Sequence, residues 1–351
     1  MAQAPLHSRR HLLQLASLGG AALAAGSLAG CRRGAAAGRL LTVRGQLPPS
    51  WLKALPSAWR SQVLEDPAEL LEQLQRPSDQ PSLSSLGDGW LQQLPAGLLQ
   101  PIEAAALLEL LDPIAQAPSR LFAGPDAAVK AFPWAFGTWV ILLRNRPDLL
   151  RRQGEGWSLL LDPSLRQRLV LPASPRLLLE LARRQLSLPP GAVDPRLVEQ
   201  LQRLHAQAIS LDERQGLNFL LAGDADAAVV TSQRAVPLLQ RDPRLAAVLP
   251  ASGSPLWWQL LVRTGPAGSP LPLEWIRDGL SLPLLDRLLA AGWVPPLPAA
   301  VLQPALQRWP RRLRPLLLPP PDLLARCTNL PPLTPAERQD LQQLWDQAMA
   351  G

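Results

Sequence analysis

The sequence predicts an α/β fold, and three observations lead to this prediction. Short apolar runs without strict alternation recur along the chain, as in strands that are buried on both faces of a parallel sheet. Helical patterns lie between these runs, and one begins with an N-cap aspartate, a proline and a first-turn acid at residues 66–69. The 40 prolines among 351 residues separate helical stretches instead of clustering, so a long disordered region is not expected.

The first thirty residues have the features of an export signal. Arg9 and Arg10 precede an apolar run of roughly 14 residues, which is shorter than the ~20 that a membrane-spanning helix needs. Small residues then precede Cys31, as in a lipobox. We therefore predict that residues 1–30 are a signal peptide, and that acyl chains on Cys31 anchor the protein in a lipid bilayer.

The export route has two candidates. The arginine pair resembles a twin-arginine signal, which is read by a translocon for folded proteins, and the general secretory route is the alternative. Either route predicts a periplasmic protein that its N-terminal lipid holds at a membrane. With Cys31 lipidated, Cys327 is the only remaining cysteine, so no intramolecular disulfide can form.

The elements after the signal follow the α/β pattern in order. Residues 31–38 are expected to form a flexible tether. Predicted strands lie at residues 39–43, 82–86, 138–143, 169–171, 227–231, 245–249 and 257–262. Predicted helices dominate the end of the chain, at residues 271–279, 281–291, 299–309 and 334–348, the last opened by a capping box.

The motifs of common enzyme classes are missing, so we predict that the protein is not an enzyme. It has no G-x-S-x-G, no G-x-G-x-x-G and no Gly-Lys pair, and His205 is the only histidine beyond the signal peptide. A histidine-rich metal site is therefore excluded, and we expect no metal and no cofactor. The net charge of +7 comes almost wholly from arginine, and the basic stretch at 308–314 is interpreted as a solvated face, not a nucleic-acid site.

Several segments together resemble a known family. They are residues 86–91 with 97–101, an aromatic-Gly-Thr segment at 132–139, a Trp-x-x-Leu-x-Asp-Pro-like turn at 157–163, residues 223–228, residues 256–258, and a Gly-Trp-x-Pro segment at 292–295. In order and spacing they resemble the type II periplasmic solute-binding proteins of ABC importers, in the spermidine/putrescine branch. The absence of tyrosine excludes ferric-iron capture through phenolates, which proteins of similar fold use.

The resemblance implies a type II fold with two α/β lobes, crossing strands between them, and a ligand cleft between the lobes. The first lobe would comprise residues 39–136 plus 257–300, and the second 137–256 plus 301–351. The implied partners are a small-molecule solute and an ABC permease in the membrane, and the protein is expected to be a monomer. The implied ligand-binding residues are Asp88, Trp90, Trp134, Thr138, Ser174, Ser232, Trp257, Trp258 and Gln259.

The chain departs from the polyamine binders where carboxylates matter. A polyamine site needs a carboxylate for each ammonium and aromatic faces along the methylenes, because an unpaired desolvated ammonium is costly. Residues 173–176 (ASPR) replace an acidic pair, and Gln259 replaces another acid, which leaves Asp88 as the plausible cleft carboxylate. We therefore expect weak polyamine affinity, or preference for a singly charged or neutral solute.

Alternative roles remain open for several of these residues. Asp88 is also a candidate helix N-cap, and the two serines are candidate cap or turn residues. The three tryptophans at 134, 257 and 258 are candidates for ordinary core packing.

Two functions follow as hypotheses. The first is a lipid-anchored receptor that hands a solute to a permease, and the second is a non-transporting lipoprotein that uses the same fold as a scaffold or sensor. A permease and ATPase gene pair beside this gene would favour the first.

Overall fold

The computed structural model describes residues 38–76, 80–95, 97–265 and 270–350. The predicted signal peptide, Cys31 and the arginine pair lie outside the described residues, as does the predicted tether except for Gly38, which begins the first strand. No helix in the described ranges combines the length and apolarity that crossing a membrane requires.

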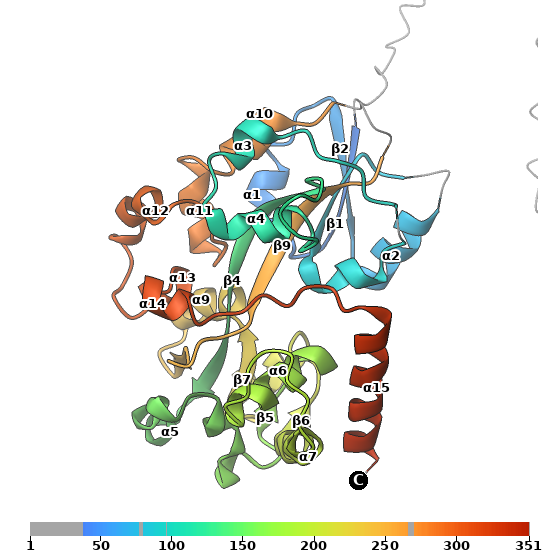
Figure 1. Ribbon diagram of the computed structural model, residues 1–351. Helices are drawn as coiled ribbons and strands as arrows, with labels where there is room; N and C mark the ends of the chain where they lie inside the picture. The colour runs from blue at the N-terminus through green and yellow to red at the C-terminus, as the bar shows by residue number, and fades with distance from the viewer. Residues whose placement is uncertain (1–37, 77–79, 96, 266–269, 351) are drawn as a thin grey trace, which may run out of the picture. The chain divides into compact units, whose positions relative to one another are not determined.

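Nine strands of the described residues form one hydrogen-bonded network in the order β2-β1-β3-β9-β4-β7-β5-β6, and β8 pairs with β4 (Figure 1). The strands are β1 (Gly38–Val43), β2 (Trp59–Leu64), β3 (Leu83–Gly87), β4 (Ala131–Arg144), β5 (Leu169–Val170), β6 (Ala208–Ser210), β7 (Ala227–Thr231), β8 (Leu245–Val248) and β9 (Leu256–Arg263). Pairing is parallel among β1, β2 and β3 and among β5, β6 and β7. The α/β prediction is confirmed, and each strand expected from the sequence overlaps an observed one, with ends that differ by one residue at several places.

Strand β4 runs through both parts of the sheet, and β9 leads from β8 back into the first part. The first part of β4 pairs antiparallel with β9, which also pairs with β3, whereas its second part pairs with β7 and β8. We call the part with β1, β2, β3 and β9 the first lobe, and the part with β5, β6, β7 and β8 the second lobe. The expected crossing strands are therefore confirmed.

Helices follow most strands, as the sequence predicts. The longer ones are α2 (Pro67–Gln75), α6 (Pro175–Gln185), α7 (Arg196–Gln207), α9 (Ser232–Arg241), α12 (Ala299–Leu306) and α15 (Pro335–Met349). The shorter ones are α1 (Pro49–Leu52), η2 (Asp88–Gln93), α3 (Ala105–Leu108), η3 (Pro113–Ala115), α4 (Gln116–Ser119), α5 (Pro147–Arg151), η4 (Gln153–Leu161), η5 (Pro163–Leu165), α8 (Leu217–Ala222), α10 (Leu273–Asp278), α11 (Leu284–Ala290), α13 (Arg314–Leu317) and α14 (Pro321–Leu324). Both predicted start signals are confirmed, because Asp66 caps α2 and Thr334 forms a capping box with Glu337 at the start of α15.

Strands β2 and β6 were not expected from the sequence. Both lie at the ends of the strand order, where one edge has no neighbouring strand. In β2 only Trp59 is buried, so the segment lacks the continuous apolar run of the central strands. Because β2 lies at the edge of the sheet, most of its side chains are not covered and can be polar, although it pairs with β1 along its whole length.

Two clusters of buried side chains form the core. The larger contains a tryptophan group in which Trp51 stacks on Trp275 at 4.5 Å, and each indole N–H donates to the other residue's carbonyl oxygen. The smaller cluster lies in the second lobe, where α15 packs beside α7 and α6 (Figure 1). Such apolar burial is the main stabilising term for a chain with no disulfide among its described residues.

Candidate functional site

Two adjoining cavities of about 450 and 410 Å³ lie where strands of both lobes end. They share lining residues from β3, β4, β9 and the loops after β5 and β6, and together we call them the cleft. Three polar segments open into it at strand ends: the step from β3 to η2, the loop from β5 to α6, and the step from β7 to α9. Binding sites of open α/β sheets commonly lie at such carboxyl ends.

Asp88 lies in the cleft because β3 ends at Gly87 and the chain turns directly into η2. Its carboxylate accepts a hydrogen bond of 3.2 Å from the backbone N–H of Trp258 in β9. Burial raises the pKa of Asp88 to about 7, although the amides of Trp258 and Gly89 and the charge of Arg176 act to lower it. Asp88 therefore ties β3 to β9 and also presents a carboxyl group that titrates near neutrality.

An aromatic wall of three tryptophans borders both cavities. Trp257 is only 8% exposed and packs edge-on against Trp293 at 5.6 Å, and its indole N–H has no hydrogen-bond partner within the described ranges. Trp90 and Trp139 are half-buried. Such faces can stack on a planar or apolar part of a solute.

Trp139 was not among the residues predicted for the site. It is the last residue of the aromatic segment 132–139, so the resemblance that pointed to this segment could have included it. Trp134, earlier in the same strand, was predicted instead. It lies in the tryptophan core, where it is 1% exposed and its ring centroid is 4.9 Å from those of both Trp51 and Trp293. Trp134 is absent from the lining of the cleft.

Trp258 and Gln259 line the larger cavity, but protein groups already hold their side chains. The Trp258 indole stacks against Phe136 at 5.2 Å and donates to Asn329 Oδ1 at 2.8 Å. The Gln259 amide donates to Ser85 Oγ at 3.2 Å. These contacts fix the cleft side of β9.

The remaining predicted polar residues divide between the cleft and the structure beneath it. Ser174 lines the smaller cavity and caps α6 by accepting from the backbone N–H of Leu177 at 3.3 Å, so it combines both expected roles. Ser232 and Thr138 are buried below the cleft, where the Thr138 backbone N–H donates to Ser232 Oγ at 3.3 Å. They join α9 to β4 and do not line either cavity.

Charged residues that the sequence did not assign to the site also border the cleft. Arg176, in the first turn of α6, lines the smaller cavity, and Arg234, in α9, lines the larger. Burial lowers the pKa of both guanidinium groups below the ordinary arginine value. Glu213 borders both cavities, and its carboxylate accepts from the Ala173 backbone N–H at 3.1 Å.

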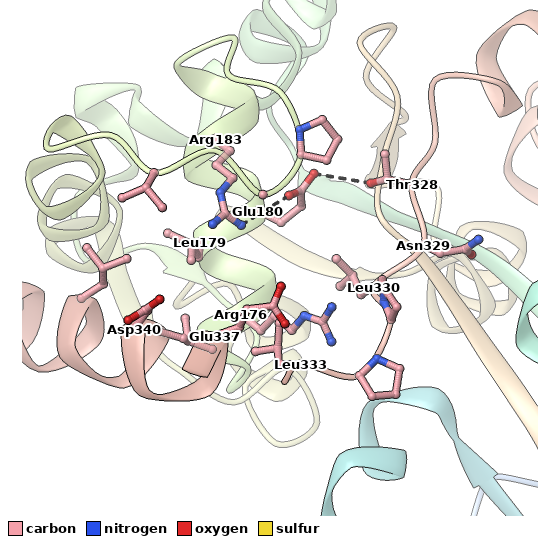
Figure 2. A pocket seen from close by; sticks show the side chains of 17 residues that line it. Arg176, Leu179, Glu180, Arg183, Thr328, Asn329, Leu330, Leu333, Glu337 and Asp340 are labelled. Atoms are coloured by element: carbon pink, nitrogen blue, oxygen red, sulfur yellow. Dashed lines mark hydrogen bonds and ion pairs between the residues drawn. The ribbon is translucent and has the colours of Figure 1, made fainter. Parts of the chain in front are cut away.

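Another cavity of about 330 Å³ lies beside α6, against residues 328–333 and α15, and shares Arg176 and Leu330 with the smaller cavity of the cleft (Figure 2). We call it the side cavity. Glu180 is paired there: it lies 3.1 Å from Arg184 and 3.9 Å from Arg183, and it accepts a hydrogen bond from Thr328 at 3.4 Å. In the described residues no group of three or more His, Cys, Asp or Glu side chains is arranged to hold a metal ion.

Solved structures with similar folds are solute-binding proteins. The spermidine/putrescine ABC transporter substrate-binding protein PotD from Streptococcus pneumoniae is 14% identical, with a TM-score of 0.69, over 89% of this chain and 98% of that one. The Tp0655 (TpPotD) lipoprotein of Treponema pallidum is 13% identical, with a TM-score of 0.63, over 88% and 98%. Lmo0181 of Listeria monocytogenes, an ABC substrate-binding protein in complex with cycloalternan, is 11% identical, with a TM-score of 0.63, over 89% and 93%.

No protein-family model and no curated protein sequence matches this chain. At these low identities the structural matches establish the fold and nothing finer. The chain has the two-lobed α/β fold of substrate-binding proteins of ABC transporters, which confirms the fold that the sequence motifs suggested.

Proposed function

We propose that the protein is an extracytoplasmic, lipid-anchored receptor that binds a small polar solute and delivers it to an ABC permease. The observation that carries this proposal is the cleft itself, which lies at strand ends of both lobes and combines an aromatic wall with the carboxyl group of Asp88. Pockets of this kind, with few polar groups among apolar walls, are the usual solute sites of α/β proteins.

The lipid anchor and the export route are part of the same proposal. Residues 1–30 would be removed after twin-arginine export, and Cys31 would carry the lipid that holds a monomeric receptor at the membrane. The name of the similar Tp0655 protein includes the word lipoprotein, which agrees with this expectation. The lobe boundaries proposed from the sequence, 39–136 plus 257–300 and 137–256 plus 301–351, are kept as part of the proposal.

Radiolabelled palmitate tests the anchor directly. We expect the label in the wild-type protein and none in Cys31→Ser, because the thiol is the proposed acylation site. An unlabelled wild-type protein that is freely soluble in the periplasm would contradict the anchor.

Solute binding is expected to close the cleft. Because β4 and the segment that leads from β8 to β9 connect the lobes, a small bend in them would bring the loops after β3 and β5 together over a ligand. Trp90, Trp139 and Trp257 line the cleft, so their fluorescence should change on binding.

A thermal-shift screen of polyamines, amino acids, sugars and organic anions tests the receptor role. A ligand at a hundred times its Kd should stabilise the folded protein by about 2.7 kcal/mol. One similar protein is named for spermidine and putrescine and another is in complex with cycloalternan, so the fold does not select the solute. The absence of any shift across all four classes would reject a small-solute receptor.

The scaffold or sensor alternative is kept because one observation favours it. The side chains of Trp258 and Gln259, which face the cleft, already have partners in the protein, and the acids of the polyamine branch are replaced. A protein that shows no solute binding but copurifies with a membrane complex would support this alternative.

A further inference from the structure

We infer that the solute of this cleft carries an anionic oxygen group, a carboxylate or a phosphate, which pairs with Arg176 and Arg234. This inference rests on the proposed receptor function and specifies its substrate class. It replaces the dication that the polyamine branch would suggest with a ligand of opposite charge.

The first argument is that both guanidinium groups lack a carboxylate partner. Arg176 makes no side-chain hydrogen bond and no ion pair with another residue of the described ranges, and Figure 2 shows its guanidinium without a marked interaction. Arg234 Nη1 donates to the backbone oxygen of Glu213 at 3.0 Å, and no described carboxylate lies within 4.0 Å of it. The charges of Asp88, Glu337 and Glu180 act on Arg176, and those of Glu213 and Asp212 act on Arg234, but none of these carboxylates lies within 4.0 Å. A directly bound anionic group would therefore add a charge-assisted hydrogen bond that the protein does not supply.

The second argument is the place of these two arginines at the cleft. Two other largely buried arginines have acidic partners: Arg146 lies 2.6 Å from Asp148 and 3.3 Å from Asp226, and Arg184 lies 3.1 Å from Glu180. Arg314 has no ion pair among the described residues and donates only to backbone carbonyl oxygens. The missing ion pairs of Arg176 and Arg234 are informative because both residues line the cleft.

The third argument is that the acids at the cleft are occupied or close to neutral. Glu213 accepts from the Ala173 amide, Asp212 accepts from the amides of Arg214 and Gln215, and burial raises the pKa of Asp88 to about 7. Glu213 and Asp212 keep their charge, but backbone amides already use part of their accepting capacity. A dication would therefore enter a site where the arginines without an ion pair have its own sign.

The position of α6 also favours an anionic ligand. This helix has eleven residues and begins at the smaller cavity, so the partial positive charge of its N-terminus lies beside Arg176. The segment is the one in which residues 173–176 replace the acidic pair of polyamine binders. The resemblance thus implies a loss of acidic residues at the point where the structure places Arg176.

A series of four-carbon compounds tests the inference on the full-length protein by calorimetry and tryptophan fluorescence. Succinate, 4-aminobutanoate, 4-hydroxybutyl phosphate, butane-1,4-diol and butane-1,4-diamine share a chain and differ in charge. We expect the carboxylates or the phosphate to bind and the diol and diamine to bind at least tenfold more weakly. Preferential binding of the diamine or the diol would overturn the inference and leave the receptor function intact.

Three variants test whether Arg176 and Arg234 cause the preference for anionic compounds. Arg176→Gln and Arg234→Gln should each weaken binding of the anionic compound at least tenfold, because each removes a charge-assisted hydrogen bond. Arg183→Gln removes the same charge from the same helix as Arg176 but faces the side cavity, so it should change affinity less than twofold. Unchanged affinity in both cleft variants would overturn the inference.

The broader screen separates this inference from the proposed function. If no four-carbon compound binds, the tightest ligand from the thermal-shift screen takes its place. An anionic ligand sensitive to Arg176→Gln supports the inference, whereas a neutral or purely cationic one overturns it. The absence of any ligand rejects the receptor itself.

Discussion

The cleft and the side cavity meet at α6, and two charged residues of this helix differ in how the protein holds them. Glu180 is enclosed by Arg183, Arg184 and Thr328, so its charge is paired within the protein. Arg176 lines both cavities and has no hydrogen bond or ion pair within the described residues, although the charge of Glu180 also acts on it. The comparison teaches that direct pairing separates a structural charge from a candidate binding charge on the same helix.

The largest expected effect on stability concerns Glu180 and its ion pair with Arg184. Glu180→Ala would leave the buried Arg184 without its carboxylate, and breaking one partner of a buried pair typically costs 3–5 kcal/mol. We expect a loss near the lower end, about 3 kcal/mol, because Arg184 keeps hydrogen bonds to the Ser252 carbonyl oxygen and to Thr328. Urea denaturation measures the free energy of unfolding.

An exposed pair provides the control for this variant. Glu274 and Arg277 form an ion pair on the surface of α10, so Glu274→Ala should cost less than about 1 kcal/mol. Equal losses of stability in Glu180→Ala and Glu274→Ala would mean that burial of the Glu180 pair contributes nothing. The contrast between the paired and unpaired charges of α6 would then fail.

The next effect concerns the floor of the cleft. Gly137 in β4 faces Ser232 Oγ and the Trp257 ring, and a Cβ atom there would lie 2.5 and 2.8 Å from them. Gly137→Ala should therefore cost about 1–3 kcal/mol through overpacking and should displace Trp257. Denaturation and the tryptophan emission spectrum measure the two effects.

An open glycine gives the matched control. Nothing lies within 4 Å of a Cβ built on Gly89, which borders the same cleft. Gly89→Ala should leave both readouts nearly unchanged. A Gly137→Ala protein as stable as the wild type would show that this floor adapts to added volume.

The sequence predicted the central framework because its signals are local. Largely apolar runs identified β1 and β9, which lie inside the sheet, whereas the edge strands β2 and β6 lack such a run. The signals for the helices that begin after Asp66 and Thr334 are also local, because each capping side chain accepts a hydrogen bond from a backbone amide two or three residues further along.

The site was predictable only in part, because its geometry depends on contacts between distant segments. Asp88 and Trp257 follow recognisable motifs and do line the cleft. Trp134 shares its segment with Trp139, and only the packing of the tryptophan core shows which of the two is covered. Arg234 carries no motif, and its missing partner is a property of the folded arrangement.

A smaller effect is expected from the carboxyl group of Asp88. Its pKa is raised to about 7 in the folded protein, so between about pH 4 and 7 the folded state binds a proton that the unfolded state has lost. Stability from this group therefore falls as pH rises through that window. Asp88→Asn should remove the fall and stabilise the protein at pH 8 by about 1–2 kcal/mol, reduced from the full linkage value because Asp88 is partly exposed.

Denaturation at pH 4 and pH 8 measures this difference. The wild type and Asp88→Asn should have similar stability at pH 4 and diverge at pH 8. Asp278→Asn, which changes an exposed aspartate of α10, provides the control. Equal stability of Asp88→Asn and wild type at pH 8 would show that the cleft carboxyl is well solvated.

The smallest effect on stability is expected from Arg176→Gln. It should change stability by less than about 0.5 kcal/mol, or raise it slightly, because the half-buried guanidinium has no direct ion pair to lose. Arg184→Gln, on the same helix, provides the comparison and should cost about 2–3 kcal/mol, because Glu180 loses its closest partner inside the protein. Arg176→Gln should also raise the pKa of Asp88 further, since the Arg176 charge acts to lower it, and the pH at which stability falls should move upward. Denaturation across pH 5–9 measures both quantities, and a destabilisation by Arg176→Gln as large as that by Arg184→Gln would place Arg176 among the structural charges.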